Sequence, residues 1–412
     1  MAVRLANALL VPWQGGDLVV SDMKGYDRAA MALLDQKPLA VHTVERYLFH
    51  PLGSDTYHPP GYYYFLAGVY AVAGHSYLAV RIAQALVDTL TCWIVFGIGT
   101  AVAGPTVGLL AAAIAATYPP SIFYTGVLLT ETLSTCLLAG AVLSLLSSKR
   151  ASGVSRLRSL ALSGILLGMA GLTRSVLLVT VPCALFWIVT NRWSGWRVAA
   201  RDSIAVLVPI ALVIAPVTLR NYQIHDRLIP VSTNGGVNFF LAHGGSERRK
   251  NEVRNIPAAY EGGQLIGVSS RTEPEEEAYF YQLGWDYVRS HSLRTMLDVP
   301  GRVRDMYWSA DYWPASPGQA GILRGIDRYW WRILAILACL GLLFLQGDAR
   351  RAAALLGCTA ASGLVIPLFF WVQTRFRIPF VPCFVVLAAA AAHGLYRALP
   401  ARPKPAGERP VT

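Results

Sequence analysis

The chain alternates between long apolar runs and shorter polar segments. The runs long enough, or nearly long enough, to cross a bilayer are 77–102, 105–122, 126–147, 158–173, 175–190, 203–219, 330–346, 353–371 and 378–397. A membrane-spanning helix needs about 20 apolar residues. The pattern therefore predicts an all-α polytopic membrane protein with about nine to ten transmembrane helices. The first apolar run, Leu5–Trp13, is too short to cross, and we expect it to be the second half of a helix whose first half is missing.

The composition agrees with a membrane protein. Hydrophobic residues make up 54% of the 412 residues, and charged residues only 15%. A soluble domain carries roughly 25% charged residues. The chain has too few charges to coat a soluble enzyme and too many apolar residues to be disordered. Its six cysteines all lie in apolar runs without metal-site spacing, which favours small packing residues over a zinc site or disulfide framework.

The placement of the net charge of +12 predicts the orientation. Basic residues gather in the short segments 147–158, 191–202 and 347–351 and in the C-terminal tail. Cytoplasmic loops of membrane proteins carry an excess of Lys and Arg, so these segments are predicted to be cytoplasmic. The long polar segments 13–60 and 220–329 then face outward. A protein that binds nucleic acid needs a clustered basic face, and the outward segments show none, so nucleic acid is not expected as a partner.

These patterns divide the chain into five parts. Residues 1–60 hold the remnant of the first transmembrane helix and the first extracytoplasmic loop, 61–219 hold transmembrane helices, and 220–329 form a second extracytoplasmic loop, predicted to be a small mixed subdomain. Residues 330–398 hold the last transmembrane helices, and 399–412 form a cytoplasmic tail. Inside the second loop, Thr272–Glu275 fits a capping box, which predicts helices over about 275–290 and 292–309.

Several acidic and imidazole side chains are expected where the spans meet the outer face. Asp22 follows the first helix, in a loop anchored at both ends. His58 precedes two prolines, which fix a rigid, extended entry into the membrane. Glu131 lies inside its predicted span, where a carboxylate is costly and is by default a functional candidate. Asp27, in contrast, is expected to be solvated, and Asp88 to form either an ion pair or part of a site.

Basic residues in the outward turns run against the charge bias and therefore need partners. They are Arg174, Arg220 with its neighbour Asn221, Arg375 and Arg377. A guanidinium binds phosphate through a bidentate fork. The sequence leaves two interpretations open: these arginines bind an anionic lipid or sugar phosphate, or they pair with Asp22, Glu131 or Asp88.

In this order, the motifs resemble membrane glycosyltransferases of the GT-C fold. The most specific stretch is HisProProGlyTyr, from His58 to Tyr62. Weaker matches follow: AlaValArgIleAlaGln (79–84), ThrGluThrLeu (130–133), GlyLeuThrArg (171–174), ArgAsnTyr (220–222) and ArgPheArgIlePro (375–379). The resemblance is greatest to glycosyltransferase family 39, which includes protein O-mannosyltransferases and the lipid A aminoarabinose transferase, and it covers nearly the whole chain.

The resemblance implies an inverting transfer of a sugar from a polyprenyl phosphate to a protein, lipid or glycan outside the cytoplasm. Asp22, in an Asp-x-x-x-Tyr pattern with Tyr26, matches the family's catalytic acid. Met23 departs from the Asp-Glu pair common in relatives. The implied substrate-binding residues are Tyr26, His58, Glu131, Arg174, Arg220, Asn221, Arg375 and Arg377. No cofactor is expected, and metal dependence stays open. There are two alternatives: a transporter or flippase for an amphiphile, and a non-catalytic assembly partner.

Overall fold

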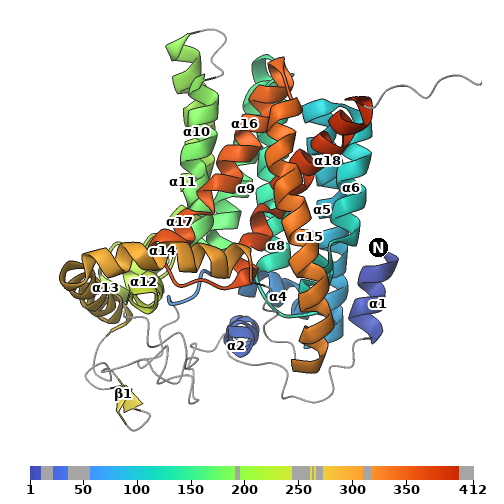
Figure 1. Ribbon diagram of the computed structural model, residues 1–412. Coiled ribbons are helices and arrows are strands. Elements are labelled where there is room, and N and C mark those ends of the chain that lie inside the picture. Colours follow the sequence, from blue (N-terminus) through green and yellow to red (C-terminus); the bar gives the residue numbers. More distant parts are fainter. Residues whose placement is uncertain are drawn as a thin grey trace, which may run out of the picture.

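The computed structural model describes residues 1–10, 22–35, 56–190, 195–243, 260–261, 264–265, 272–309 and 317–398. A bundle of long helices makes up most of it, and shorter helices lie across one end (Figure 1). The predicted tail at 399–412, and the stretches 11–21 and 36–55 of the predicted N-terminal part, lie outside the described residues.

The helices of the bundle run roughly along one direction (Figure 1). They are α5 (Tyr77–Ala103), α6 (Pro105–Thr117), α8 (Glu131–Ser148), α9 (Gly153–Thr173), α10 (Thr180–Thr190), α11 (Trp196–His225), α15 (Pro317–Phe344), α16 (Gly347–Ser362) and α18 (Val381–Ala398). Shorter pieces at one end are α1 (Ala2–Leu10), α2 (Asp22–Leu34), α4 (Gly61–Ala73), α7 (Pro119–Tyr124), η2 (Ser175–Val179), α17 (Val365–Phe369) and η4 (Thr374–Phe380).

The structure confirms a helical, multi-pass membrane protein, and the predicted number of nine to ten spans stays a prediction. Among the described residues, five helical stretches are long and apolar enough to cross a membrane, and two shorter apolar helices cover Pro105–Thr117 and Ser175–Thr190. Proline explains one shortening. The run 105–122 breaks between α6 and α7 at Tyr118, directly before Pro119, because the residue before proline disfavours the helical conformation.

The basic loops meet at one end of the bundle. Lys149, after α8, lies 3.0 Å from the Asp348 carboxylate at the start of α16. At the same end the Trp187 indole N–H donates to the Arg351 carbonyl at 3.2 Å, which joins α10 to α16. The short segments that predicted a cytoplasmic face therefore share one side of the molecule. The helix ends at Glu131, Thr173 and His225 lie at the other.

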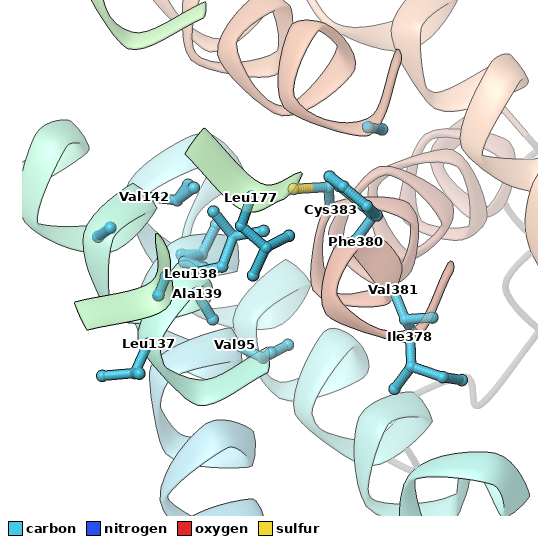
Figure 2. Packing of buried hydrophobic residues seen from close by; sticks show 14 of the residues in the cluster. Val95, Leu137, Leu138, Ala139, Val142, Leu177, Ile378, Phe380, Val381 and Cys383 are labelled. Atoms are coloured by element: carbon cyan, nitrogen blue, oxygen red, sulfur yellow. The ribbon is translucent and has the colours of Figure 1, made fainter. Parts of the chain in front are cut away.

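Tight apolar packing holds the bundle together. Figure 2 shows buried side chains from α5, α8, η2, η4 and α18 meeting in one cluster. Val95, Leu138, Phe380 and Cys383 in this cluster are each at most 2% exposed. Because the core includes the 3₁₀ segments η2 and η4, it also fixes the irregular backbone at the functional end.

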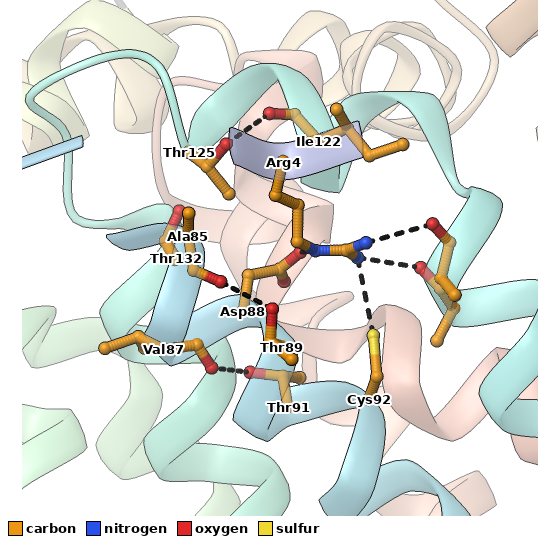
Figure 3. A network of polar contacts seen from close by, with 12 residues as sticks. Arg4, Ala85, Val87, Asp88, Thr89, Thr91, Cys92, Ile122, Thr125 and Thr132 are labelled. Carbon is orange, nitrogen blue, oxygen red and sulfur yellow. Dashed lines mark hydrogen bonds and ion pairs between the residues drawn. The ribbon is translucent and has the colours of Figure 1, made fainter. Parts of the chain in front are cut away.

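The short first helix, α1, is tied to the bundle by polar contacts inside the membrane domain (Figure 3). The Arg4 guanidinium pairs with the Asp88 carboxylate of α5 and donates to the Ala116 carbonyl at 3.0 Å. The Asn7 amide donates to the Ile122 carbonyl at 2.9 Å. Removing either member of a buried ion pair leaves an uncompensated charge. Asp88 is therefore a structural partner of Arg4, one of the two roles that the sequence left open for it.

The described residues of the second long polar segment form a helical layer across the end of the bundle (Figure 1). It contains α12 (Gly235–His243), α13 (Glu273–Ser290), α14 (Ser292–Tyr307) and a hairpin of β1 (Tyr260–Glu261) and β2 (Gln264–Leu265). The predicted capping box is confirmed at Thr272 and Glu275, as are the two predicted helices that follow it.

A close approach joins α12 to α13 in this layer. A Cβ on Gly236 would lie 2.1 Å from the Glu277 carbonyl oxygen, so only glycine fits there. The Glu277 carboxylate accepts the amide N–H groups of Gly235 and Gly236, which lower its pKa. Burial outweighs them and raises the pKa of Glu277 from 4.5 to about 7.

We expect Glu277 to make the outer layer less stable as the pH rises. Between about pH 4.5 and 7 the folded state binds more protons at this carboxyl than the unfolded state does. Stability contributed by this group is therefore full below pH 4.5 and is lost as the pH rises through 7. Glu277→Gln should reduce the drop in melting temperature between pH 5 and pH 8, followed by thermal unfolding in detergent. An unchanged drop would contradict this assignment.

Candidate active site

Four charged side chains from distant parts of the chain meet at the end of the bundle opposite the basic loops. A guanidinium nitrogen of Arg375 lies 2.8 Å from an oxygen of Asp22, and its Nε lies 3.6 Å from Glu131 Oε1. Arg174 contacts the same Glu131 oxygen at 2.7 Å and donates to the Thr130 hydroxyl at 3.1 Å. We call Asp22, Glu131, Arg174 and Arg375 the active-site cluster.

Local structure places each of these charges favourably. Asp22 and Glu131 are the first residues of α2 and α8, and Arg174 caps the C-terminus of α9. Carboxylates are stabilised near a helix N-terminus and cations near a C-terminus. Arg375 belongs to the 3₁₀ segment η4 between the end of α17 and α18. The ends of these helical segments therefore place two carboxylates and two guanidinium groups close together.

Exposure within the cluster falls from the outside inward. The side chain of Asp22 is 30% exposed, those of Arg174 and Arg375 are 12% and 9%, and that of Glu131 is fully buried. Burial raises the pKa of Asp22. The positive charges of Arg375, and then of His58 and Arg174, lower the pKa by more, so that it lies below the usual 3.8. Asp22 is therefore ionised at neutral pH and is the member of the cluster most open to solvent.

The sequence did not identify all the neighbours of the two arginines. The ring of Phe376 lies 4.7 Å from the guanidinium carbon of Arg174 and 5.5 Å from that of Arg375. Arg375 Nε also donates to the Gln373 side-chain carbonyl. The Phe376 ring attracts both guanidinium groups through cation–π contacts. It therefore helps to fix their positions without adding another charged side chain to the cluster. The alternation of Arg and Phe over residues 375–377 was the only sequence signal for this arrangement.

His58 and Tyr26 lie near Asp22. Their rings are tilted against each other with centroids 4.9 Å apart, and an edge-on contact of 5.1 Å joins Tyr26 to Tyr62 of α4. The Tyr62 hydroxyl in turn donates to Gln84 at 2.8 Å. Burial raises the pKa of Tyr26 well above its usual 10, and the neighbouring Asp22 raises it further. Tyr26 is therefore a neutral hydroxyl next to the ionised Asp22.

The HisProProGly segment is held from both sides. Thr56, just before it, donates its backbone N–H to the Glu273 carboxylate at 2.9 Å, which ties the first outer loop to α13. A Cβ on Gly61 would lie 2.8 Å from Thr173 Oγ1 and 2.9 Å from the Leu172 carbonyl oxygen. The glycine thus lets α4 begin directly against the end of α9, next to Arg174.

Arg377 does not join the active-site cluster, although we predicted it as a phosphate ligand. Its side chain is fully buried, pairs with Asp327, and donates to the carbonyls of Tyr307 and Ser309 at 3.0 and 3.1 Å. Its guanidinium carbon also lies 4.4 Å from the Trp331 ring. These contacts join η4 to α14 and α15.

Arg220 and Asn221 also make contacts away from the four charges. The buried Asn221 amide donates to the carbonyls of Ile229 and Val231 at 3.1 and 3.3 Å, which shapes the turn after α11. Arg220 donates to the Asn221 side-chain carbonyl at 3.3 Å. Their geometry favours a role in building the outer end over direct contact with substrate.

Asp27 is not solvated, and that expectation was wrong. It is 9% exposed and accepts hydrogen bonds from the hydroxyl groups of Tyr70 and Tyr77, at 2.6 and 3.0 Å, and contacts Nε2 of His75 at 2.9 Å. The helical periodicity of α2 turns Asp27 toward the corner between α4 and α5. This could not be predicted from sequence spacing, because the three partners lie more than 40 positions further along the chain.

No metal site stands out in the part of the chain that the structure describes. Within these residues, no group of three or more His, Cys, Asp or Glu side chains could hold a metal ion.

Comparison with known proteins shows which fold the chain has. Residues 57–219 match the model of a family described as dolichyl-phosphate-mannose-protein mannosyltransferase. The apo crystal structure of the oligosaccharyltransferase from Archaeoglobus fulgidus matches 96% of this chain and 50% of its own, with 16% identity and a TM-score of 0.56. The chain has the GT-C fold. The resemblance found in the sequence motifs is thereby confirmed.

A second structure related to this GT-C chain is the oligosaccharyltransferase AglB from Archaeoglobus fulgidus in complex with an inhibitory peptide and a dolichol-phosphate. The match covers 98% of this chain and 51% of AglB, with 13% identity and a TM-score of 0.51. ArnT from Cupriavidus metallidurans, bound to undecaprenyl phosphate, matches over 95% of this chain and 76% of ArnT, with 12% identity and a TM-score of 0.43. The chain spans about half the length of the oligosaccharyltransferases. No curated protein sequence matches it.

Proposed function

We propose that this GT-C chain transfers a sugar from a polyprenyl-phosphate donor to a hydroxyl acceptor on the extracytoplasmic face, with inversion. Asp22 removes the acceptor proton, and Arg174 and Arg375 stabilise the phosphate as it leaves. The membrane domain holds the isoprenoid tail. The acceptor is a protein, lipid or glycan, and nucleic acid has no place in the reaction.

One observation carries the proposal: an ionised, partly exposed carboxylate lies next to two nearly buried guanidinium groups. Arg375 contacts both Asp22 and Glu131, at 2.8 and 3.6 Å. A general base must reach the acceptor hydroxyl, and fixed cations must meet the charge that develops on the leaving phosphate. The exposed Asp22 and the deeper arginines suit these two tasks.

Glu131 adds support from its unsatisfied oxygen. Oε1 is engaged by both arginines, but no described residue donates a hydrogen bond to the buried Oε2. A buried acceptor without a donor costs about 1–3 kcal/mol. A hydroxyl of a bound sugar would supply that donor, so we propose that Glu131 both holds the arginines apart and orients the donor sugar.

The direct test is transfer of labelled sugar. Membranes containing the protein are incubated with a panel of labelled polyprenyl-phosphate sugars, and the labelled product is identified. Labelled acceptor in the wild type, and none with Asp22→Asn, supports the proposal. Movement of intact labelled donor across vesicles without transfer would instead support the alternative of a transporter or flippase for an amphiphilic lipid-linked substrate.

We expect the active-site cluster to face away from the cytoplasm. Ser152→Cys and Ser292→Cys place one exposed thiol at each end of the molecule, before α9 and at the start of α14. In intact cells, a membrane-impermeant maleimide should label the Ser292→Cys protein well above the unsubstituted background, and the Ser152→Cys protein only after lysis. The reverse pattern would place the cluster on the cytoplasmic side.

A further inference from the structure

We infer that Asp27 is a positioning residue that fixes α2, and with it Asp22, at the active-site cluster. The role in catalysis rests on the proposed function, whereas the fixing of α2 does not. The Asp27 cluster consists of Asp27, Tyr70, His75 and Tyr77, which come from α2, the end of α4, the α4–α5 link and the start of α5.

The Asp27 carboxylate is held by contacts that come from defined directions. One carboxylate oxygen accepts from the Tyr70 hydroxyl at 2.6 Å and contacts His75 Nε2 at 2.9 Å, and the other accepts from the Tyr77 hydroxyl at 3.0 Å. The His75 ring lies edge-on between the two tyrosine rings, with centroids 4.9 and 5.1 Å away. Both oxygens are therefore engaged by a rigid aromatic corner, which sets the height and the rotation of the helix that carries them.

The buried apolar residues of α2 do not fix its rotation in the same way. Its other buried residues, Met23, Tyr26, Ala29 and Ala30, belong to the apolar core. Apolar burial is non-directional, and a helix of this length is marginal on its own. Hydrogen bonds at defined angles are needed to hold one register.

Asp22 and Asp27 hold α2 at two separate points. Five residues along an α-helix correspond to about 140° of rotation and about 7.5 Å of rise. The two carboxylates therefore project from different sides of α2 at different heights, and each anchors the helix to different neighbours. Asp22 is the more exposed of the two, so loss of the Asp27 contacts would let α2 turn or slide and would carry the Asp22 carboxylate away from Arg375.

The test uses two substitutions of nearly the same size. Asp27→Leu removes both acceptor oxygens, whereas Asp27→Asn keeps one oxygen for Tyr70 and His75, and its amide can donate to the Tyr77 hydroxyl. Misplacing a reacting group by about 1 Å can cost about 10²-fold. We therefore expect Asp27→Leu to lower kcat by roughly 10–100-fold with donor KM unchanged, and Asp27→Asn to stay near the wild type.

Amide hydrogen exchange gives a readout that does not depend on activity. Peptides covering residues 22–34 should exchange faster in Asp27→Leu and at the wild-type rate in Asp27→Asn. Asp35→Leu, an exposed carboxylate just after α2, is the matched control and should change neither measurement. If Asp27→Leu does not fold, Tyr77→Phe removes one hydroxyl only and should give the same changes at smaller amplitude.

Three results would overturn the inference. They are unchanged exchange of α2 in Asp27→Leu, faster exchange without any loss of kcat, and equal loss in Asp27→Asn and Asp27→Leu. The last would mean that the charge of Asp27, and not its hydrogen bonds, is what matters. If the wild type transfers no sugar from any donor, the proposed function fails, and hydrogen exchange alone then decides whether Asp27 fixes α2.

Discussion

Asp22→Asn should lower the rate of sugar transfer by about 10²–10⁴-fold, the usual cost of removing a general base. The amide is nearly the same shape as the carboxylate and can still accept from Arg375, which lies 2.8 Å away. The position of α2 should therefore survive, while the ability to take a proton is lost. The measurement is kcat in detergent with a labelled donor, with donor binding assayed in parallel.

Asp35→Asn is the control for Asp22→Asn. It removes one carboxylate from the same outer segment at an exposed position after α2, so it changes the local charge equally without touching the active-site cluster. We expect its kcat to match that of the wild type. Full activity in Asp22→Asn, or equal loss in both variants, would remove Asp22 from the proposed mechanism.

Arg375→Lys and Arg377→Lys should fail in different ways, although the two arginines are two residues apart. Lysine keeps the charge but not the planar fork. Arg375→Lys loses hydrogen bonds at the active-site cluster, each worth about 1.5–3 kcal/mol when charged. It should therefore fold and raise donor KM by roughly 10–100-fold.

Arg377→Lys should instead weaken the fold. The Arg377 guanidinium satisfies Asp327 and several backbone carbonyls in a site that is closed to solvent. Breaking a buried ion pair costs about 3–5 kcal/mol, and a single ammonium replaces the fork poorly. We expect a lower yield of folded protein and a lower melting temperature, with normal donor KM in the folded fraction. A normal melting temperature together with a raised donor KM would indicate instead that Arg377 binds the donor phosphate.

The sequence by itself determined the class of protein and predicted much of the candidate site. Apolar runs predicted the membrane helices, because a bilayer requires about 20 apolar residues for each span. Charged residues at the ends of those runs are costly unless they have partners, and this identified Asp22, Glu131, Arg174 and Arg375. Local chemistry was also sufficient for the capping box at Thr272, since its two hydrogen bonds lie within four residues.

Only the tertiary structure decided which charges meet. Arg375 and Arg377 look equivalent in sequence, but they lie in a 3₁₀ segment, where two residues correspond to about 240° of rotation. They therefore point to different sides, one toward Asp22 and the other toward Asp327.

The same limit explains Asp27. Its three partners become neighbours only when α2 packs against the corner between α4 and α5. A hydrogen bond depends on distance and angle in space. Sequence spacing fixes these within one helix, whereas the packing of separate helices sets them across the fold.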